Sequence, residues 1–474
     1  MSSTQEKQED LATKDSWGRS AVPECFELLL GLINFEAIEE IAYDARMKQL
    51  IEQQAEPVED VRSLMGDLTC RINRDKKMTG SYNVVFTILW SDKVKWILRI
   101  PGKGLEVEEL DDEKMNAEYG TMEYIRKNTT IPLPQVFHWE TDNMVAGVPF
   151  ALIAFVEGSP LYNSWFDGPD GVSDDSLFAL LDELAKNMAQ LYRMKFDKLG
   201  MMDFSKDPKN PSVRPVISTE FGMDETGFGM TIELPQQTSF KEMLRHTAGQ
   251  YDVDGDEIKK SAIDILKFCI TSIPEFMEPK GPFYLTIPDF DMQNVMVDDK
   301  NKLTGFIDMD NVMTLPACAG CARYPMWITE DWTQDLPGDF DLKDLEDKEE
   351  EGMKDADPAD KPKFVRVRPP FDPYEEESLE PQREHYLAAM IKEAGPDFDP
   401  RVLRLSPIVE TIRYALDHEG YLRQNAHKLL TFAKVSFTLK QWSKADKNRR
   451  KVLTVELREK FGRMWKDHAN GKPV

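Results

Sequence analysis

The pattern of apolar and polar positions changes along the chain and predicts strands first. Tyr82 to Trp90 and Val94 to Ile100 are rich in β-branched and aromatic residues, and Ser91-Asp92-Lys93 between them has turn composition. These segments predict a β-hairpin. Val148 to Val156 predicts a further apolar strand, which Gly158 and Pro160 end.

Helical spacing of apolar residues dominates the remainder of the chain. Helices are expected at about Pro23 to Gln53, Glu113 to Lys127, Asp175 to Phe196 and within Leu379 to Lys466. Strands therefore come first and helices afterwards. This order predicts an α+β fold with a small antiparallel-sheet lobe followed by a larger, mainly helical lobe.

Five segments follow from this pattern. They are a flexible N-terminal leader (1–22), a small lobe with its preceding helix (23–155), a large lobe (156–338), an acidic insert or loop (339–378) and a C-terminal helical part (379–474). The insert contains LEDKEEEGMKDADPADK, which is dense in charge and almost free of apolar residues. Such a composition is typical of a solvated loop or linker.

Composition narrows the classes of partner. Of 474 residues, 41% are hydrophobic, which is enough for a sizeable core, and the formal net charge is −26. This charge argues against nucleic acid or a membrane surface as the main partner. The first twenty residues contain no apolar block and the cysteines are only five, so we expect a cytoplasmic protein in a reducing compartment. Cys318 and Cys321 lack a second ligand pair and are expected to be free thiols.

The segment FYLTIPDFDMQNVMVDDKNKLTGFIDMDN, residues 283 to 311, carries the clearest candidate chemistry. Two short apolar runs flank a polar turn and predict an antiparallel hairpin, at one end of which Asn294 and Asp308 should meet. Asp289 lies in the loop that approaches this end. Carboxylate and amide oxygens suit Mg²⁺, and a free carboxylate beside the metal can accept the proton of an attacking hydroxyl. An Asp-rich turn between core strands is the alternative interpretation.

A second candidate pair is Arg99 and Glu118. Glu118 lies on the apolar stripe of its predicted helix, and a buried carboxylate requires a partner. Alternation along the strand of Lys95 and Ile97 places Arg99 on one face of the sheet, as the natural partner. The pair could hold phosphates or could be a purely structural ion pair.

The motif D-x-x-x-x-N, followed by strand, turn, strand and another Asp, resembles the catalytic loop and metal-binding Asp of kinases. Segments such as GSYNVVFTILW, ILRIP, NAEYGTMEYIRKNTTIPLPQV and GVPFALIAFVEGSPL resemble the small lobe of the aminoglycoside phosphotransferase and choline kinase family, in its fungal variety. The resemblance extends from about Phe35 to Trp332. It implies a two-lobed, protein-kinase-like fold and transfer of the γ-phosphoryl group of ATP, with Mg²⁺, to a hydroxyl of a small molecule.

The resemblance also implies roles for individual residues. Asp289 would be the catalytic base, and Asn294 and Asp308 would hold Mg²⁺. The nucleotide-binding residues would be Arg99, positioned by Glu118, the phosphate-covering turn with Gly80, Ser81 and Asn83, and the backbone of Phe155 and Val156 at the adenine. Taken alone, the Gly80 turn is also typical of an ordinary turn, because it has a single glycine.

Two departures support another interpretation. The family usually has His two residues before the catalytic Asp, where this chain has Ile287, and the acidic insert follows residue 338. A catalytically impaired, kinase-like nucleotide-binding or scaffold protein is therefore the alternative. A protein kinase ranks lower because Asp308-Met309-Asp310 lacks the D-F-G arrangement.

The acceptor is expected to be neutral or cationic. Magnesium and Arg99 would neutralise the negative charge of the nucleotide, which leaves part of a set of acidic residues to contact the acceptor. The alternative is that these carboxylates only share the overall negative charge of the chain. The set comprises Asp289, Asp291, Asp308, Asp310, Asp331 and Asp335.

Overall fold

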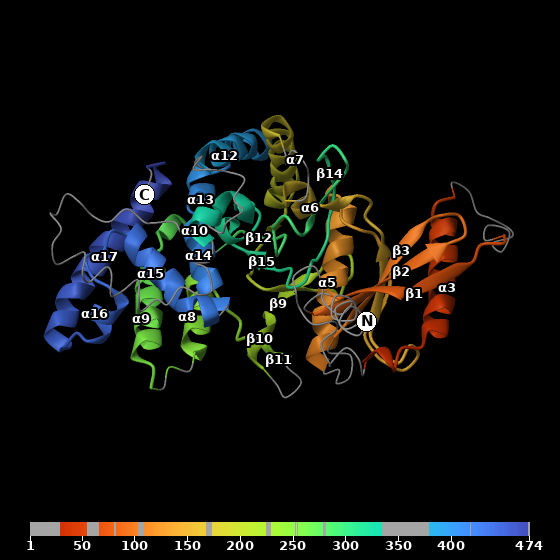
Figure 1. The fold of residues 1–474 in the computed structure, drawn as a ribbon, viewed down its shortest axis with the longest axis horizontal. Helices are drawn as coiled ribbons and strands as arrows, with labels where there is room; N and C mark the ends of the chain where they lie inside the picture. Colours follow the sequence, from red (N-terminus) through yellow and green to blue (C-terminus); the bar gives the residue numbers. More distant parts are fainter. Residues whose placement is uncertain are drawn as a thin grey trace, which may run out of the picture.

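Strands precede helices in the computed structural model, as the hydrophobic pattern predicts, and the two-lobed α+β class is confirmed (Figure 1). The structure describes residues 29–54, 66–79, 82–102, 109–166, 173–223, 229–251, 253, 255–277, 281–333, 379–417 and 419–472. The N-terminal leader and the acidic insert, both predicted from composition, lie outside these residues. The five predicted segment boundaries stay predictions.

The small lobe is built on a five-stranded antiparallel sheet in the order β1-β2-β3-β5-β4. The predicted hairpin is β2 and β3, with Asn83 opposite Pro101 and Leu89 opposite Lys95. Lys93 in its turn has φ 72°, which lets the tight connection close. The strands are β1 (Cys70–Thr79), β2 (Asn83–Trp90), β3 (Lys95–Pro101), β4 (Val136–Glu140) and β5 (Phe150–Ala154).

The two faces of this sheet have different roles. Trp96, Leu98 and Ile100 pack into a core shared with helix α3 (Phe35–Glu52). Because side chains alternate along a strand, Arg99 points to the opposite face, where helix α5 (Glu109–Asn128) lies. Figure 1 shows the sheet between these two helices. The sheet thus presents one cationic side chain to the helix that carries Glu118.

Two elements differ from the sequence-based prediction. β1 was not predicted, because its residues from Asn73 onward are mostly exposed and polar, as is usual for an edge strand. The helix predicted from about Pro23 to Gln53 is interrupted: Leu29 and Leu30 are helical, residues 31–34 are not, and α3 begins at Phe35, where the side chain of Asn34 accepts a hydrogen bond from the Ala37 amide. Residues 23 to 28 lie outside the described part of the chain.

The large lobe is mainly helical. Its helices are α6 (Leu161–Phe166), α7 (Asp174–Arg193), α8 (Phe240–Gln250), α9 (Glu257–Thr271), α10 (Glu330–Thr333), α12 (Glu380–Ala394), α13 (Pro400–Arg404), α14 (Ser406–Asp417), α15 (Leu422–Phe432), α16 (Leu439–Ser443) and α17 (Lys447–Ala469). One-turn 3-10 segments lie at Glu275–Met277, Ala317–Ala319, Met326–Thr329 and Glu419–Tyr421. The helices predicted within Leu379 to Lys466 are confirmed.

Short strands complete the large lobe. They are β6 (Ser159–Pro160), β7 (Lys195–Phe196), β8 (Met201–Asp203), β9 (Ser212–Arg214), β10 (Ile217–Met223), β11 (Gly229–Glu233), β12 (Phe283–Leu285), β13 (Val295–Val297), β14 (Leu303–Phe306) and β15 (Thr314–Leu315). The predicted hairpin is β13 and β14, with Val295 opposite Phe306. None of the described helices combines the length and apolar character needed to cross a bilayer.

The segment between the lobes packs closely on this hairpin. Gly158, at φ 108°, leaves no space for a side chain, since a Cβ there would lie 2.2 Å from the Val297 carbonyl oxygen. Gly305 is equally confined, because its Cβ would meet a Val156 methyl at 2.8 Å. The β13-β14 hairpin is thereby held against the junction of the two lobes.

Candidate active site

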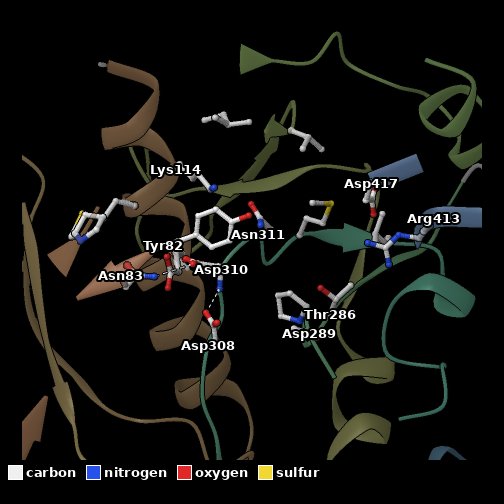
Figure 2. A pocket seen from close by; sticks show the side chains of 18 of the residues that line it. Tyr82, Asn83, Lys114, Thr286, Asp289, Asp308, Asp310, Asn311, Arg413 and Asp417 are labelled. Atoms are coloured by element: carbon white, nitrogen blue, oxygen red, sulfur yellow. Dashed lines mark hydrogen bonds between the residues drawn. The ribbon is translucent and has the colours of Figure 1, made fainter. Parts of the chain in front are cut away.

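A cleft of about 620 Å³ receives side chains from both lobes. The small lobe contributes Asn83, Arg99 and Glu118, and the large lobe contributes Asp289 and Asp308. Figure 2 shows Asn83, Asp308 and Asp310 at one side of the cleft, Thr286 and Asp289 near its middle, and Arg413 and Asp417 at the other side. Five of the eight predicted site residues that the structure describes therefore line one cavity.

Arg99 is the centre of an acidic cluster at the small-lobe side. Its Nη1 contacts Glu118 Oε1, and its Nη2 lies 3.2 Å from Asp308 Oδ1 and 2.9 Å from Asp310 Oδ2. Nη1 also donates to the Tyr119 hydroxyl at 3.1 Å. Arg99 and Glu118 are only 8% and 6% exposed. The ion pair predicted from the helix stripe and the strand alternation is present, and two further carboxylates join it.

The ionisable groups of this cluster differ in the direction of their pKa shifts. Burial opposes the charge of Arg99, but Asp310 and Glu118 outweigh it and raise the pKa of the guanidinium. Burial raises the pKa of Glu118 well above its usual range and the neighbouring Asp310 raises it further, while Arg99 acts in the opposite direction. Burial also opposes the charge of Asp310, yet Arg99 and Glu118 keep its pKa well below the usual range. Of these two carboxyl groups, Asp310 is the one whose ionised form the cluster stabilises.

The loop before β13 positions Asp289. Its Oδ2 accepts hydrogen bonds from Asn294 Nδ2 at 2.8 Å and Gln293 Nε2 at 2.7 Å, and its carbonyl accepts from the Asn294 side chain at 3.1 Å. Both carboxylate bonds use the same oxygen. The other oxygen, Oδ1, is the atom available to a hydroxyl group in the cleft.

Asp308 lies at the predicted end of the hairpin. The Ile307 amide donates to the Asn294 carbonyl at 3.0 Å, so the ends of the two strands are adjacent. Asp308 itself has φ 61°, a conformation that is costly for a residue other than glycine and that occurs preferentially at functional sites. Burial and then Asp310 raise the pKa of Asp308. A cation would relieve this accumulation of negative charge.

The donor set fits Mg²⁺ better than a soft metal. The side-chain nitrogen of Asn294 donates to Asp289, so the side-chain oxygen of Asn294 is the atom that could bind a metal. Asp308 adds a half-exposed carboxylate. Within the described residues, no group of three or more His, Cys, Asp and Glu side chains could hold a metal ion by itself. Mg²⁺ commonly takes only one or two protein carboxylates and completes its shell with phosphate and water. Cys318 and Cys321 are buried and form no disulfide.

Other predicted residues are not brought into the cleft. Phe155, Val156 and the predicted metal ligand Asn294 are absent from its lining, and the Phe155 amide donates to the Lys95 carbonyl at 3.4 Å. Their contact with adenine stays a prediction. Gly80 and Ser81 lie outside the described residues, so the phosphate-covering turn stays a prediction as well.

Sequence reasoning missed two contributors. Asp310 was considered only as part of the acceptor's acidic surroundings, whereas it pairs with Arg99 and accepts a hydrogen bond from Asn83 Nδ2 at 3.3 Å. Arg323, which lines the cleft behind Asp289, was not noticed at all. A lone cation within an apolar run is a signal that could have identified it, because a buried charge needs a partner.

The profile of the phosphotransferase enzyme family (APH) matches residues 79–336, more than half of the chain. The chain belongs to this family of kinase-like transferases. The resemblance stated from the sequence is thereby confirmed.

Curated relatives share one name, altered inheritance of mitochondria protein 9, mitochondrial. The protein from Clavispora lusitaniae is 20% identical over 331 residues, which cover 58% of this chain and 54% of the relative. The protein from Kluyveromyces lactis is 24% identical over 421 residues, or 75% of this chain and 64% of the relative. The chain thus spans about half to two thirds of the length of these relatives.

Solved structures with similar chains include members of the same family. A candidate aminoglycoside phosphotransferase from Ralstonia eutropha JMP134 has a TM-score of 0.46 at 14% identity and covers 93% of this chain and 100% of its own. The complex of an aminoglycoside 2″-phosphotransferase with GDP and kanamycin has a TM-score of 0.38 at 13% identity and covers 87% and 98%.

Proposed function

We propose that the chain is an ATP- and Mg²⁺-dependent phosphotransferase that transfers the γ-phosphoryl group to a hydroxyl of a small molecule. The observation that carries the proposal is that Asp289, Asp308 and the buried Arg99 line one cleft, with the Asn294 side chain hydrogen-bonded to Asp289. Phosphoryl transfer needs positioning and charge neutralisation more than covalent chemistry from the protein. Family membership supports the reaction class.

Each side chain has a distinct task in this reaction. Asp289 Oδ1 accepts the proton of the attacking hydroxyl, while the bonds to Oδ2 from Gln293 and Asn294 fix the carboxylate. Mg²⁺, held by Asn294 and Asp308, would neutralise phosphate charge. Arg99 is oriented by Glu118 and can turn an Nη toward phosphate oxygens.

The test is nucleotide turnover by the parent protein, Asp289→Asn and Asp308→Ala across a panel of hydroxyl acceptors. Loss of a general base or a metal ligand should lower turnover about 10²- to 10⁴-fold, while thermal unfolding stays near that of the parent protein. Equal turnover in all three proteins would contradict the assignment.

A catalytically impaired nucleotide-binding or scaffold protein is the second candidate. The observation that favours it is the complete engagement of Arg99 by Glu118, Asp308 and Asp310. Nucleotide must displace at least one of these contacts to reach the guanidinium. Mg²⁺-dependent binding of ATP without transfer to any acceptor would support this candidate against the first.

We further propose a neutral or cationic acceptor. Asp308 and Asp310 are occupied by Arg99, but Asp289 and Asp291 face the cleft and Asp417 joins them. Asp335 and the side chain of Asp331 lie outside the described residues, so their part in this set stays a prediction. An amine-bearing acceptor should lose kcat/KM as ionic strength rises. If an anionic acceptor is the better substrate at low salt, this proposal is wrong.

The compartment has two competing proposals. The sequence supports the cytoplasm, and the names of the curated relatives support the mitochondrion. Subcellular fractionation with protease protection of the untagged protein separates the two, since only a protein enclosed by a membrane resists the protease.

A further inference from the structure

We infer that Arg323, held by Glu410, is a positioning residue that fixes the backbone of the catalytic loop and thereby aims Asp289. This inference rests on the proposed function. Arg323 is 3% exposed and follows the 3-10 turn Ala317–Ala319. It reaches the loop from the large-lobe side, opposite to Arg99.

The contacts of Arg323 converge on the two residues before Asp289. Nη2 donates to the Ile287 carbonyl at 2.7 Å and also to the Pro288 carbonyl. Nη1 donates to Glu410 Oε2 at 2.6 Å, and Glu410 lies in α14. One rigid, planar guanidinium therefore ties the entry of the catalytic loop to a core helix.

The loop needs such an anchor at this point. Regular strand pairing of β12 ends at Leu285, opposite Thr314. Ile287 is buried with an apolar side chain and Pro288 has no amide hydrogen, so neither residue has a side-chain donor to hold the loop and Pro288 has no backbone donor either. Their carbonyls require donors, and Arg323 supplies them.

The orientation of the guanidinium favours this role over that of an ordinary structural ion pair. Arg323 Nε is buried and has no hydrogen-bond partner among the described residues. An unsatisfied buried donor is costly, so the side chain adopts this orientation for the contacts made at its two terminal nitrogens. Those nitrogens serve the loop carbonyls and Glu410.

A matched control is available in Arg383. It is 9% exposed, donates from Nη1 to the Ile328 carbonyl at 2.9 Å and pairs with Glu380 at 3.1 Å. It does not line the cleft. Lysine keeps the charge at either position but cannot reproduce a planar fork that serves two carbonyls and a carboxylate.

The experiment compares Arg323→Lys and Arg383→Lys in thermal unfolding, nucleotide KM and kcat. A displacement of about 1 Å at a reacting group can cost about 10²-fold in rate. We expect Arg323→Lys to lower kcat about 10- to 100-fold with nucleotide KM nearly unchanged, and Arg383→Lys to lower stability alone. Glu410→Gln, which keeps an acceptor for Arg323, should lower kcat less than Glu410→Leu.

The outcomes separate the two levels of the proposal. If the parent protein transfers no phosphoryl group to any acceptor, the proposed function fails and the inference falls with it. If the parent is active and Arg323→Lys retains its kcat, only the inference is overturned. The same holds if both lysine variants lose kcat in proportion to their loss of stability.

Discussion

Two buried arginines face the cleft from opposite lobes, and their surroundings differ. Arg99 directs its nitrogens at side-chain carboxylates and is surrounded by more negative charge than it can neutralise. Arg323 directs its nitrogens at backbone carbonyls and at a single carboxylate, Glu410. In the proposed function, Arg99 would exchange partners when a nucleotide binds. Arg323 is arranged to stay in place.

The acidic residues beside the two arginines differ too, in the direction in which their pKa values are shifted. Asp310, in direct contact with Arg99, has a pKa far below its usual range although burial opposes its charge. Asp291 lies close enough to Arg323 to feel its charge, yet burial raises the pKa of Asp291 to about 6. Among the carboxyl groups that Arg99 contacts, Arg99 outweighs burial at Asp310, whereas burial and the neighbouring carboxylates outweigh Arg99 at Glu118 and Asp308.

The largest expected effect is that of Arg99→Met. Removing one partner from a buried ion cluster leaves uncompensated carboxylates, which costs about 3–5 kcal/mol of unfolding free energy. Nucleotide binding should be lost together with this stability. Urea unfolding at pH 7 and calorimetric titration with Mg²⁺-ADP measure the two quantities.

The control for this variant is Arg46→Met. Arg46 is 7% exposed in the small lobe and pairs with Asp92 at 2.9 Å, away from the cleft. It should lose stability and retain nucleotide binding. If the two variants behave alike in both measurements, Arg99 is only a structural ion pair.

The contacts around Arg99 could be predicted from the sequence because they depend on residue type and on the regular spacing of residues along a helix or strand. Glu118 stood out as a charge on an apolar stripe, and alternation along β3 selected Arg99 as its partner. Asp289, Asn294 and Asp308 followed from the geometry of a hairpin, which fixes which residues are neighbours. Asp310 was missed because its contact with Arg99 depends on the left-handed φ of Asp308. No residue pattern predicts that conformation.

The Arg323 side could not be predicted in the same way. Its ligands are backbone carbonyls, which every residue has and which leave no signature in the sequence. Its carboxylate partner, Glu410, is 87 residues away and follows the acidic insert. The edge strand β1 was missed for a related reason, since its polar residues lack the alternation that marks a half-buried strand.

A smaller effect is expected from Mg²⁺ at the Arg99 side. Together with ADP, Mg²⁺ at about 100 times its dissociation constant should raise the unfolding free energy by about 2.7 kcal/mol. Asp308→Asn should remove most of this gain. Asp299→Asn, in the exposed turn between β13 and β14, is the control and should keep it. An unchanged Mg²⁺ effect in Asp308→Asn would exclude Asp308 as a metal ligand.

The smallest effect is expected from the pH dependence of Asp291. Because its pKa is raised to about 6 in the folded protein and is about 4 in the unfolded chain, ionised Asp291 disfavours folding. This penalty is absent below about pH 4, grows as the pH rises toward 6 and is complete above about pH 7. Asp291→Asn should therefore stabilise the protein at pH 7.5, by about 1–3 kcal/mol, and have little effect near pH 4.5, where most of the penalty is already absent.

Urea unfolding at the two pH values measures this difference, with Asp299→Asn as the control. A stabilisation of equal size at both pH values would mean that the Asp291 carboxylate is not the titrating group. A loss of stability at pH 7.5 would mean that Arg323 compensates Asp291 in the way that Arg99 compensates Asp310, and the contrast between the two arginines would not hold.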